Sequence, residues 1–394
     1  MGNYLIVGNG VAGTTAAENI RKADREGAVT MVTDEDLPFY YRLRLSEYLA
    51  GDLAEQDLVA KGDSWYRDQR IDLKLKTRVV GADAHKKIVR LESGEELSYD
   101  TLLIATGSHS FIPPIQGAER KGVFALRSVQ DARDIMAYGR EVDEVVLIGG
   151  GLLGLEAGNA LVKTGKRVMV VEFFPRLLPR QLDVEGAERL QKMMEGMGFS
   201  FRLGAKTEAI TGEDRVDGVR LEGGDRLSAK MVIISAGVRP NMDLAEPLGL
   251  DRDKGIQVNA QMQTSQPEIY AAGDVAEFNG IPYGIWPAAL EQGKIAGNNM
   301  AGGQMTYQGT TMANTLKVAG VDLASAGNID AENELESMVA TDTGIYKKIV
   351  MDQGRVVGCI MLGDTKGFNK ITQAIAQKLE ISRIKDQPFM EAFH

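Results

Sequence analysis

The sequence predicts an α/β protein with two doubly wound, parallel-sheet domains, the second inserted in the first, and a small α+β domain at the C-terminal end. An apolar strand followed by a glycine-rich turn and a helix occurs twice, near residue 8 and near residue 149. After the second occurrence, the pattern returns to strands that suit the first domain. We expect a first domain of residues 1–110 and 240–309, a second of 111–239 and a third of 310–394.

The first glycine-rich segment has the parts of a Rossmann-like dinucleotide-binding turn. Residues 4–7 form an apolar run that is typical of a buried parallel strand. The glycines that follow have GxGxxG spacing: Gly8, Gly10 and Gly13. They allow a tight turn, a close approach of phosphate, and close packing of the helix from Val11, whose free N–H groups face the phosphates. Asp34, expected at the end of the next strand about 20 residues later, suits ribose hydroxyls.

The second segment repeats this pattern. The strand 144–148 precedes three further glycines: Gly149, Gly151 and Gly154. Glu172 ends the following strand and suits both ribose hydroxyls of NADH. A 2′-phosphate about 4 Å from this carboxylate would cost roughly 4 kcal/mol per unit charge at an effective dielectric of about 20. NADH is therefore preferred over NADPH, although nearby Arg176 would soften the preference. Two such turns indicate two dinucleotides and electron transfer between them.

Composition and charge exclude several classes of protein. The net charge is −10 and the pI about 5.1, which argue against nucleic acid as a main partner. One cysteine among 394 residues allows neither an intrachain disulfide nor a redox dithiol, and three scattered histidines do not suggest a metal site. No apolar run has the length of about 18 residues that a membrane span needs, and the N-terminus lacks the basic flank of a signal peptide. We expect a cytoplasmic protein without a metal.

Several segments between the two turns also carry expectations. Arg42 and Arg44 lie in an aromatic, basic loop, where they would contact phosphate or adenine. The alternative is a surface loop with solvated arginines. Residues 72–98 alternate in the manner of an antiparallel meander, and residues 100–107 form a buried strand that ends in a glycine turn.

The chain then leaves the first domain and returns to it. Prolines and a glycine within residues 113–117 indicate a first crossover, and the loop 237–241 a second. A strand ending at Gly273-Asp274 follows, and then a helix over residues 286–300 with a proline near its start. The final segment, about 310–394, alternates strands with one helix.

In this order, the motifs resemble the FAD-dependent pyridine nucleotide-disulfide oxidoreductases of the glutathione reductase fold, over the whole chain. In that family the first turn and the Gly-Asp pair hold FAD, and the second turn holds NAD(P)H. Three stretches look most like NADH:rubredoxin oxidoreductases: 40–45, 172–183 and 316–325. They are also similar to the flavin-binding N-terminal portion of assimilatory nitrite reductases. The ferredoxin reductases of dioxygenase systems are more distant.

The residues and the resemblance together give the expected site. Glu156 is expected to align the nicotinamide amide and Trp286 to wall the flavin, with helix packing as the alternative for each. Cofactor contacts are expected at Gly8, Gly10, Val11, Ala12, Gly13, Asp34, Glu35, Arg42, Arg44, Ala105, Thr106, Gly107, Gly149, Gly151, Leu152, Leu153, Gly154, Glu156, Glu172, Gly237, Gly273, Asp274 and Trp286.

Departures from the family pattern are equally informative. Disulfide reductases carry a cysteine pair on the helix after the first turn, where this chain has residues 14–16, Thr-Thr-Ala. A redox-active disulfide is therefore not expected, and Cys359 is expected to be a buried small hydrophobe. Glu47 stands where the dioxygenase-type ferredoxin reductases have a lysine that pairs with a glutamate, here Glu156.

We therefore expect an FAD-dependent NADH oxidoreductase that passes electrons to a small one-electron carrier, a rubredoxin-like or iron–sulfur protein. The C-terminal segment and the Arg42/Arg44 loop are candidate docking rims. Alternatives are a hydrogen-peroxide-forming NADH oxidase, an electron-input subunit of a larger complex, and a flavin-bearing sensor or scaffold. Either a monomer or a homodimer is compatible with the sequence.

Overall fold

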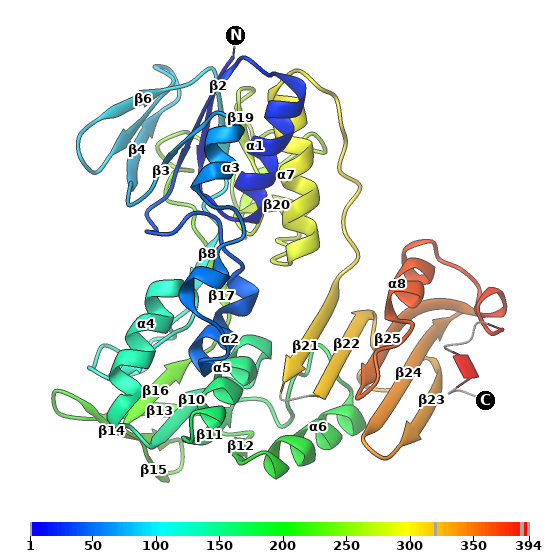
Figure 1. The fold of residues 1–394 in the computed structure, drawn as a ribbon. Helices are drawn as coiled ribbons and strands as arrows, with labels where there is room; N and C mark the ends of the chain where they lie inside the picture. Colours follow the sequence, from blue (N-terminus) through cyan, green and yellow to red (C-terminus); the bar gives the residue numbers. More distant parts are fainter. Residues whose placement is uncertain (1, 319–320, 387–389, 392–394) are drawn as a thin grey trace. The chain divides into compact units, whose positions relative to one another are not determined.

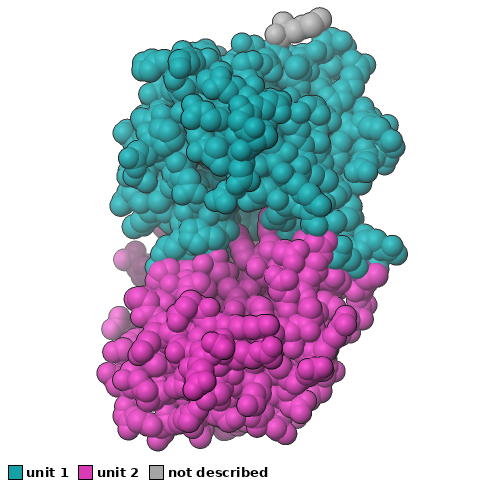
Figure 2. All heavy atoms as spheres, turned by 90° about the vertical axis from the view of Figure 1, so that its left-hand side faces the viewer, with its two compact units in different colours: residues 1–41, 55–109, 238–310 teal, residues 42–54, 110–237, 311–394 magenta. Residues whose placement is uncertain are grey.

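A computed structural model describes residues 2–318, 321–386 and 390–391. They form two compact units, each made of three segments (Figure 2). Unit 1 comprises Met1–Tyr41, Glu55–His109 and Val238–Thr310. Unit 2 comprises Arg42–Ala54, Ser110–Gly237 and Thr311–His394. The boundaries of the three domains stay a prediction.

The centre of unit 1 is a parallel five-stranded sheet (Figure 1). Its order is β19 (Ile269–Ala271), β7 (Thr101–Ile104), β1 (Asn3–Val7), β2 (Ala28–Val32) and β3 (Ile71–Lys74). The chain places β2 and β3 on one side of β1, and β7 and β19 on the other. The carboxyl ends of β1 and β7 therefore meet at a topological switch point, where open α/β sheets bind ligands.

The predicted meander over residues 72–98 is wrong in its first part. β3 joins the parallel sheet beside β2, because Ile71 is buried and pairs with Val29. The chain turns after β3 through Lys76, whose φ is 49°. Only the remainder is antiparallel: β4 (Val79–Asp83), β5 (Ile88–Leu91) and β6 (Glu96–Ser98).

Two helices of unit 1 lie side by side: α1 (Val11–Ala23) and α7 (Trp286–Met300) (Figure 1). A Cβ at Gly293 would lie within 3.0 Å of the Ala12 backbone, and one at Gly297 within 2.8 Å of the Ala16 backbone. The two glycines therefore permit the close approach. The predicted start and end of α7 are confirmed.

The other elements of unit 1 are η2 (Glu55–Leu58), α3 (Asp63–Asp68), β17 (Val238–Pro240), β18 (Ile256–Val258) and β20 (Ala276–Phe278). The strand β8 (Ser108–Ser110) begins in unit 1 and ends in unit 2.

Unit 2 repeats the arrangement of the parallel sheet. The order is β12 (Phe199–Leu203), β11 (Arg167–Glu172), β10 (Glu144–Ile148), β16 (Met231–Ile234) and β9 (Val123–Phe124). The switch point lies between β10 and β16. An antiparallel group follows: β13 (Thr207–Gly212), β14 (Val216–Leu221) and β15 (Arg226–Ser228). The helices are η1 (Arg42–Arg44), α2 (Leu45–Ala50), α4 (Val129–Tyr138), η3 (Gly139–Glu141), α5 (Leu152–Lys163) and α6 (Val184–Gly196).

The C-terminal part of unit 2 is an antiparallel sheet with one main helix (Figure 1). Its order is β21 (Ala313–Val318), β22 (Val321–Gly327), β25 (Arg355–Leu362), β24 (Ile345–Asp352) and β23 (Glu336–Asp342). The helix α8 (Phe368–Ala376) packs on β25 and β22, and η4 spans Ile381–Arg383. The predicted α/β class, with two Rossmann-like sheets and an α+β end, is confirmed.

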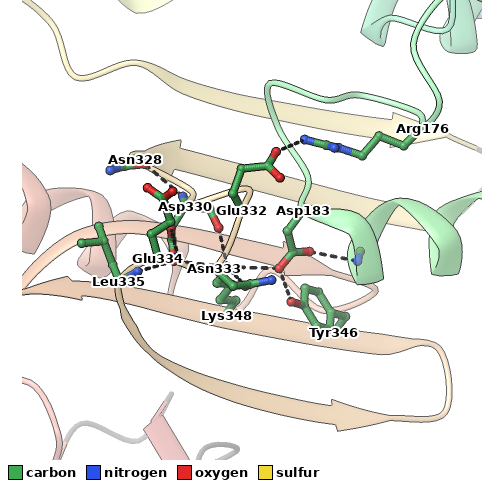
Figure 3. A network of polar contacts seen from close by, with 11 residues as sticks. Arg176, Asp183, Asn328, Asp330, Glu332, Asn333, Glu334, Leu335, Tyr346 and Lys348 are labelled. Carbon is green, nitrogen blue, oxygen red and sulfur yellow. Dashed lines mark hydrogen bonds and ion pairs between the residues drawn. The ribbon is translucent and has the colours of Figure 1, made fainter.

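A buried polar network ties this C-terminal sheet to the segment before α6 (Figure 3). Lys348 on β24 has a fully buried side chain. Its Nζ lies 3.2 Å from a carboxylate oxygen of Asp183 and 3.9 Å from one of Asp330. It also donates to the carbonyl of Asp330 at 2.8 Å and to Oδ1 of Asn333 at 2.7 Å. One cation therefore lies between two buried carboxylates inside the unit.

Asp183 is the central acceptor of this network. Its Oδ1 accepts the Gly186 N–H at 3.0 Å and so caps α6, while Oδ2 accepts the Tyr346 hydroxyl at 2.6 Å. Arg176 and Glu332 form a second ionic link at 3.2 Å. The same carboxylate thus stabilises the start of α6 and holds the C-terminal sheet against it.

We predict that Lys348→Met lowers the free energy of unfolding by about 3–5 kcal/mol, because it leaves Asp183 and Asp330 buried without a cation. Lys347→Met is the matched control. Lys347 is also buried, but its partner Asp364 has a side chain that is 40% exposed and stays hydrated. Denaturant unfolding of both variants measures the difference. Equal losses of unfolding free energy in the two variants would contradict a special contribution of the buried network to stability.

Candidate functional site

The first glycine turn joins β1 to α1 at the switch point of unit 1. Gly8 has φ +115°, and a Cβ there would collide with the carbonyl of Ala105, which follows β7. A Cβ at Gly13 would collide with the carbonyl of Gly8. At Gly10, by contrast, no described heavy atom lies within 4 Å of such a Cβ, apart from those of the glycine and its chain neighbours. The first and third glycines are thus needed by the fold, and the second borders open space at a helix N-terminus.

The second turn has the same construction in unit 2. Gly149 has φ +106° and lies against the carbonyl of Ser235, which follows β16. A Cβ at Gly154 would lie 2.6 Å from the carbonyl oxygen of Gly149. The same holds within 4 Å of a Cβ at Gly151. Both turns therefore fit a pyrophosphate, which needs close backbone approach and free N–H groups.

The two predicted ribose acids differ in their surroundings. Glu172 ends β11 as predicted and is only 7% exposed. Its carboxylate accepts the N–H of Gly150 at 2.6 Å and that of Phe174 at 2.8 Å. The prediction that Asp34 ends its strand is wrong, because β2 ends at Val32 and the exposed Asp34 lies beyond it. The ribose contact of Asp34 stays a prediction.

The Gly-Asp pair lies after β19 and is held by polar contacts within unit 1. Asp274 accepts the hydroxyl of Ser108 at 2.7 Å. The N–H of Gly273 donates to Oε1 of Gln292 at 2.9 Å, and Gln292 is fully buried on α7. Sequence reasoning did not select Ser108 or Gln292 as site residues. The position of Ser108 just after the Thr-Gly turn was the available signal.

Asn241 braces the Thr-Gly turn after β7. Its Nδ2 donates to the carbonyl of Thr106 at 2.7 Å, and the Thr106 hydroxyl donates to the Asn241 carbonyl at 2.8 Å. The N–H of Asn241 also donates to the carbonyl of Gly107 at 2.9 Å. The turn is therefore fixed by a residue far from it in sequence.

Trp286 begins α7 and belongs to an aromatic cluster of unit 1. Its ring centre lies 6.1 Å from that of Phe39 and 5.8 Å from that of Tyr41. Trp286 is thus packed among rings, and its role as a flavin wall stays a prediction.

The other expected contact residues lie around the turns: Val11 and Ala12 begin α1, Leu152 and Leu153 begin α5, Glu35 follows β2, and Gly237 follows β16 with φ +94°.

Glu156, Arg42 and Arg44 lie in unit 2. Arg42 donates to the carbonyl of Arg127 at 3.0 Å, and Arg44 pairs with Glu47 at 2.9 Å. The helix α2, which carries Glu47, packs against α5, which carries Glu156. Burial, and then the charge of Glu47, raise the pKa of Glu156 from 4.5 to about 7. The phosphate contacts expected for the two arginines stay predictions.

Other reactive groups are scarce. Cys359 is fully buried in β25, and burial raises the pKa of its thiol to about 12, so it carries no thiolate at neutral pH. Among the described residues, no group of three or more metal-ligating side chains is arranged to hold a metal ion. In the same residues, no helix combines the length and the apolar character that a membrane crossing requires.

We predict that Glu156→Gln stabilises the protein at a pH of about 8 but hardly at about 5. The folded chain holds a proton on Glu156 up to a pKa of about 7, whereas the unfolded chain releases it near 4.5. The free energy of unfolding of the parent chain therefore falls by at most about 3 kcal/mol as the pH rises from 4.5 to about 7. Thermal unfolding at both pH values measures the gain, and Glu47→Gln should give a smaller gain of the same sign. An equal gain at both pH values would contradict the assignment.

The chain is similar to several curated relatives. A nitrite reductase (NAD(P)H) of Bacillus subtilis is 38% identical over 96% of this chain and 48% of the relative. An NADH oxidase of Methanocaldococcus jannaschii is 32% identical over 98% of this chain and 94% of the relative. An NADH-rubredoxin oxidoreductase of Clostridium acetobutylicum is 30% identical over 94% and 93%. The chain spans about half the length of the nitrite reductase relatives.

Solved structures show the same fold. An NAD-dependent persulfide reductase from A. fulgidus has a TM-score of 0.93 at 27% identity, over 99% of this chain and 82% of that one. A covalent putidaredoxin reductase–putidaredoxin complex has a TM-score of 0.90 at 27% identity, over 99% and 98%.

Family models match most of the chain. Residues 313–379 match the rubredoxin NAD+ reductase C-terminal domain. Residues 2–293 match the pyridine nucleotide-disulphide oxidoreductases, whose cofactors are FAD and NAD(P)H. With its two glycine turns at the two switch points, the chain belongs to the pyridine nucleotide-disulphide oxidoreductase family.

Proposed function

We propose that this protein is an FAD-dependent NADH oxidoreductase that passes electrons singly to a small rubredoxin-like or iron–sulfur carrier protein. The observation that carries the proposal is the pair of dinucleotide turns in a chain whose one cysteine is buried. FAD, when bound, supplies the conversion between a hydride and single electrons. The reaction is proposed to take place in the cytoplasm.

The absence of a dithiol separates this chain from disulfide reductases. The first turns of α1 carry Thr14, Thr15 and Ala16 in place of cysteines. Cys359 lies in the C-terminal sheet and has no second thiol with which to form a disulfide. Electrons must therefore leave without a thiol relay, and a carrier protein that takes them directly is the simplest acceptor.

The second turn supports NADH as the donor. A carboxylate offers about four acceptor positions, and Glu172 uses two of them for backbone N–H groups. The remainder suit two ribose hydroxyls. A 2′-phosphate would meet a buried carboxylate instead, and even about 1.4 kcal/mol of repulsion gives a tenfold preference for NADH. Arg176, which sequence reasoning expected to soften this preference, is paired with Glu332.

The proposed partner rests on the comparisons and on charge. The C-terminal segment matches a domain named for rubredoxin NAD+ reductases, and one relative is an NADH-rubredoxin oxidoreductase. The putidaredoxin reductase structure holds a small partner protein on the same fold. Because this chain has a net charge of −10 and small iron carriers are usually acidic too, we expect a locally basic or apolar docking patch.

The test is an anaerobic mixing experiment. NADH should reduce the bound flavin at least about tenfold faster than NADPH, because of the charge on Glu172. Rubredoxin added next should be bleached much faster than an arbitrary dye carrier is reduced. If the flavin is reduced but rubredoxin is bleached no faster than the dye, the carrier is not the acceptor. If NADH does not reduce the flavin, the proposal of an NADH oxidoreductase is contradicted.

An NADH oxidase is the second candidate, because one relative that covers nearly the whole chain is an NADH oxidase. Oxygen uptake with hydrogen peroxide formation, at a rate that matches flavin reduction, would favour it. The nitrite reductase relatives, about half of whose length this chain spans, favour an electron-input subunit instead. Stable co-purification with iron–sulfur subunits would support that reading.

A further inference from the structure

The Gly-Asp turn after β19 packs against the start of α1. Gly273 has φ +83°, and a Cβ there would lie 3.0 Å from the Cβ of Ala12, which is in the first turn of that helix. Asp274 is partly exposed, whereas Gly273 and Val275 on either side of it are buried. The turn therefore brings a carboxylate to the same end of α1 that the first glycine turn opens to a phosphate.

Two buried side chains from different elements hold this turn. Gln292 on α7 accepts the N–H of Gly273 at 2.9 Å, which fixes the backbone. Ser108 at the start of β8 is only 8% exposed, and its hydroxyl donates to Oδ2 of Asp274 at 2.7 Å. An ionised carboxylate can only accept hydrogen bonds, so the serine is the donor. The backbone and the carboxylate are therefore both held in place by groups of unit 1 itself.

The hydrogen bond from Ser108 suits a role in holding the carboxylate. Its length of 2.7 Å fits a hydroxyl that donates to a charged oxygen, and such bonds are roughly twice as strong as neutral ones. Because Ser108 is buried, water competes little for its hydroxyl. A partly exposed aspartate would otherwise lose rotamer freedom when a ligand binds, and the serine reduces that loss.

A carboxylate beside the glycine turn suits a group that bears hydroxyls and no charge. The helix end favours the phosphates of a dinucleotide, whereas the negative charge of Asp274 repels them. In FAD, the ribityl chain follows the pyrophosphate, and its hydroxyl groups can donate to a carboxylate. The glycine turn and the neighbouring carboxylate thus match two neighbouring groups of FAD.

We propose that Ser108 is a positioning residue for FAD, which holds the Asp274 carboxylate in the orientation that accepts ribityl hydroxyls. The serine acts through Asp274 and does not itself contact the cofactor. It thereby supports recognition of the ribityl chain, in addition to the phosphate recognition of the glycine turn. This inference rests on the proposed function, in which FAD occupies the first turn.

Ser108→Ala tests this role with two ligands. FAD and ADP share the adenosine and the pyrophosphate, but ADP has no ribityl chain. In fluorescence titrations of the deflavinated full chain, Ser108→Ala should bind FAD about 5- to 50-fold more weakly, because the hydrogen bond that orients the carboxylate is lost. ADP, measured by calorimetric titration, should bind the variant and the parent chain with affinities within about twofold of each other. A merely structural role of Ser108 would weaken both ligands alike.

A double-mutant cycle tests whether Ser108 acts through Asp274. Asp274→Ala should weaken FAD binding more than Ser108→Ala does, because it removes the carboxylate itself. Adding Ser108→Ala to Asp274→Ala should change the FAD affinity by less than about twofold, since no carboxylate is left to be oriented. Ser110→Ala, further along β8, is the matched control and should bind FAD like the parent chain.

Three results would each overturn the positioning role and leave the proposed function intact. They are an FAD affinity of Ser108→Ala within about twofold of the parent, equal losses for FAD and ADP, and additive losses in the double variant. If Asp274→Ala fails to fold, the comparison of FAD with ADP still decides. A parent chain that binds no FAD would overturn both the positioning role and the proposed function.

Discussion

In both units, the glycine turn rests against the carbonyl of the residue that follows the neighbouring strand across the switch point, and the site depends on this contact. Gly8 lies against Ala105 and Gly149 against Ser235, so only a residue without a Cβ and with positive φ fits. The contact sets where each helix begins. It thereby leaves one side of the turn, beside the second glycine, open to a phosphate.

On this shared backbone plan, the two turns differ in their side-chain contacts. Glu172 bonds its own turn and brings a buried negative charge to the second site, which suits neutral ribose hydroxyls and opposes a 2′-phosphate. The matching position of the first turn is Asn9, which accepts the Tyr66 hydroxyl inside unit 1. Since the family is named for disulphide chemistry and this chain has a single cysteine, we propose that electrons pass from one dinucleotide to the other and out without a disulfide.

Features encoded by local spacing could be predicted from the sequence, and features made by distant contacts could not. The strand–turn–helix segments, Glu172 at the end of its strand and the span of α7 all follow from neighbouring residues. β3 was missed because its pairing with β2, not its alternation, decides its sheet. Asn9 and Tyr66 are 57 residues apart, and Asp183 and Lys348 lie further apart still, so neither network leaves a local pattern.

The most direct measurement of the central claim, a thiol-free route, is the number of electrons that the protein accepts. Anaerobic titration of the flavin-loaded protein with NADH, followed by its absorbance, gives this number. With FAD as the only acceptor, about one NADH per flavin should complete the reduction. Uptake of about two NADH per flavin would reveal a second redox group and contradict the account.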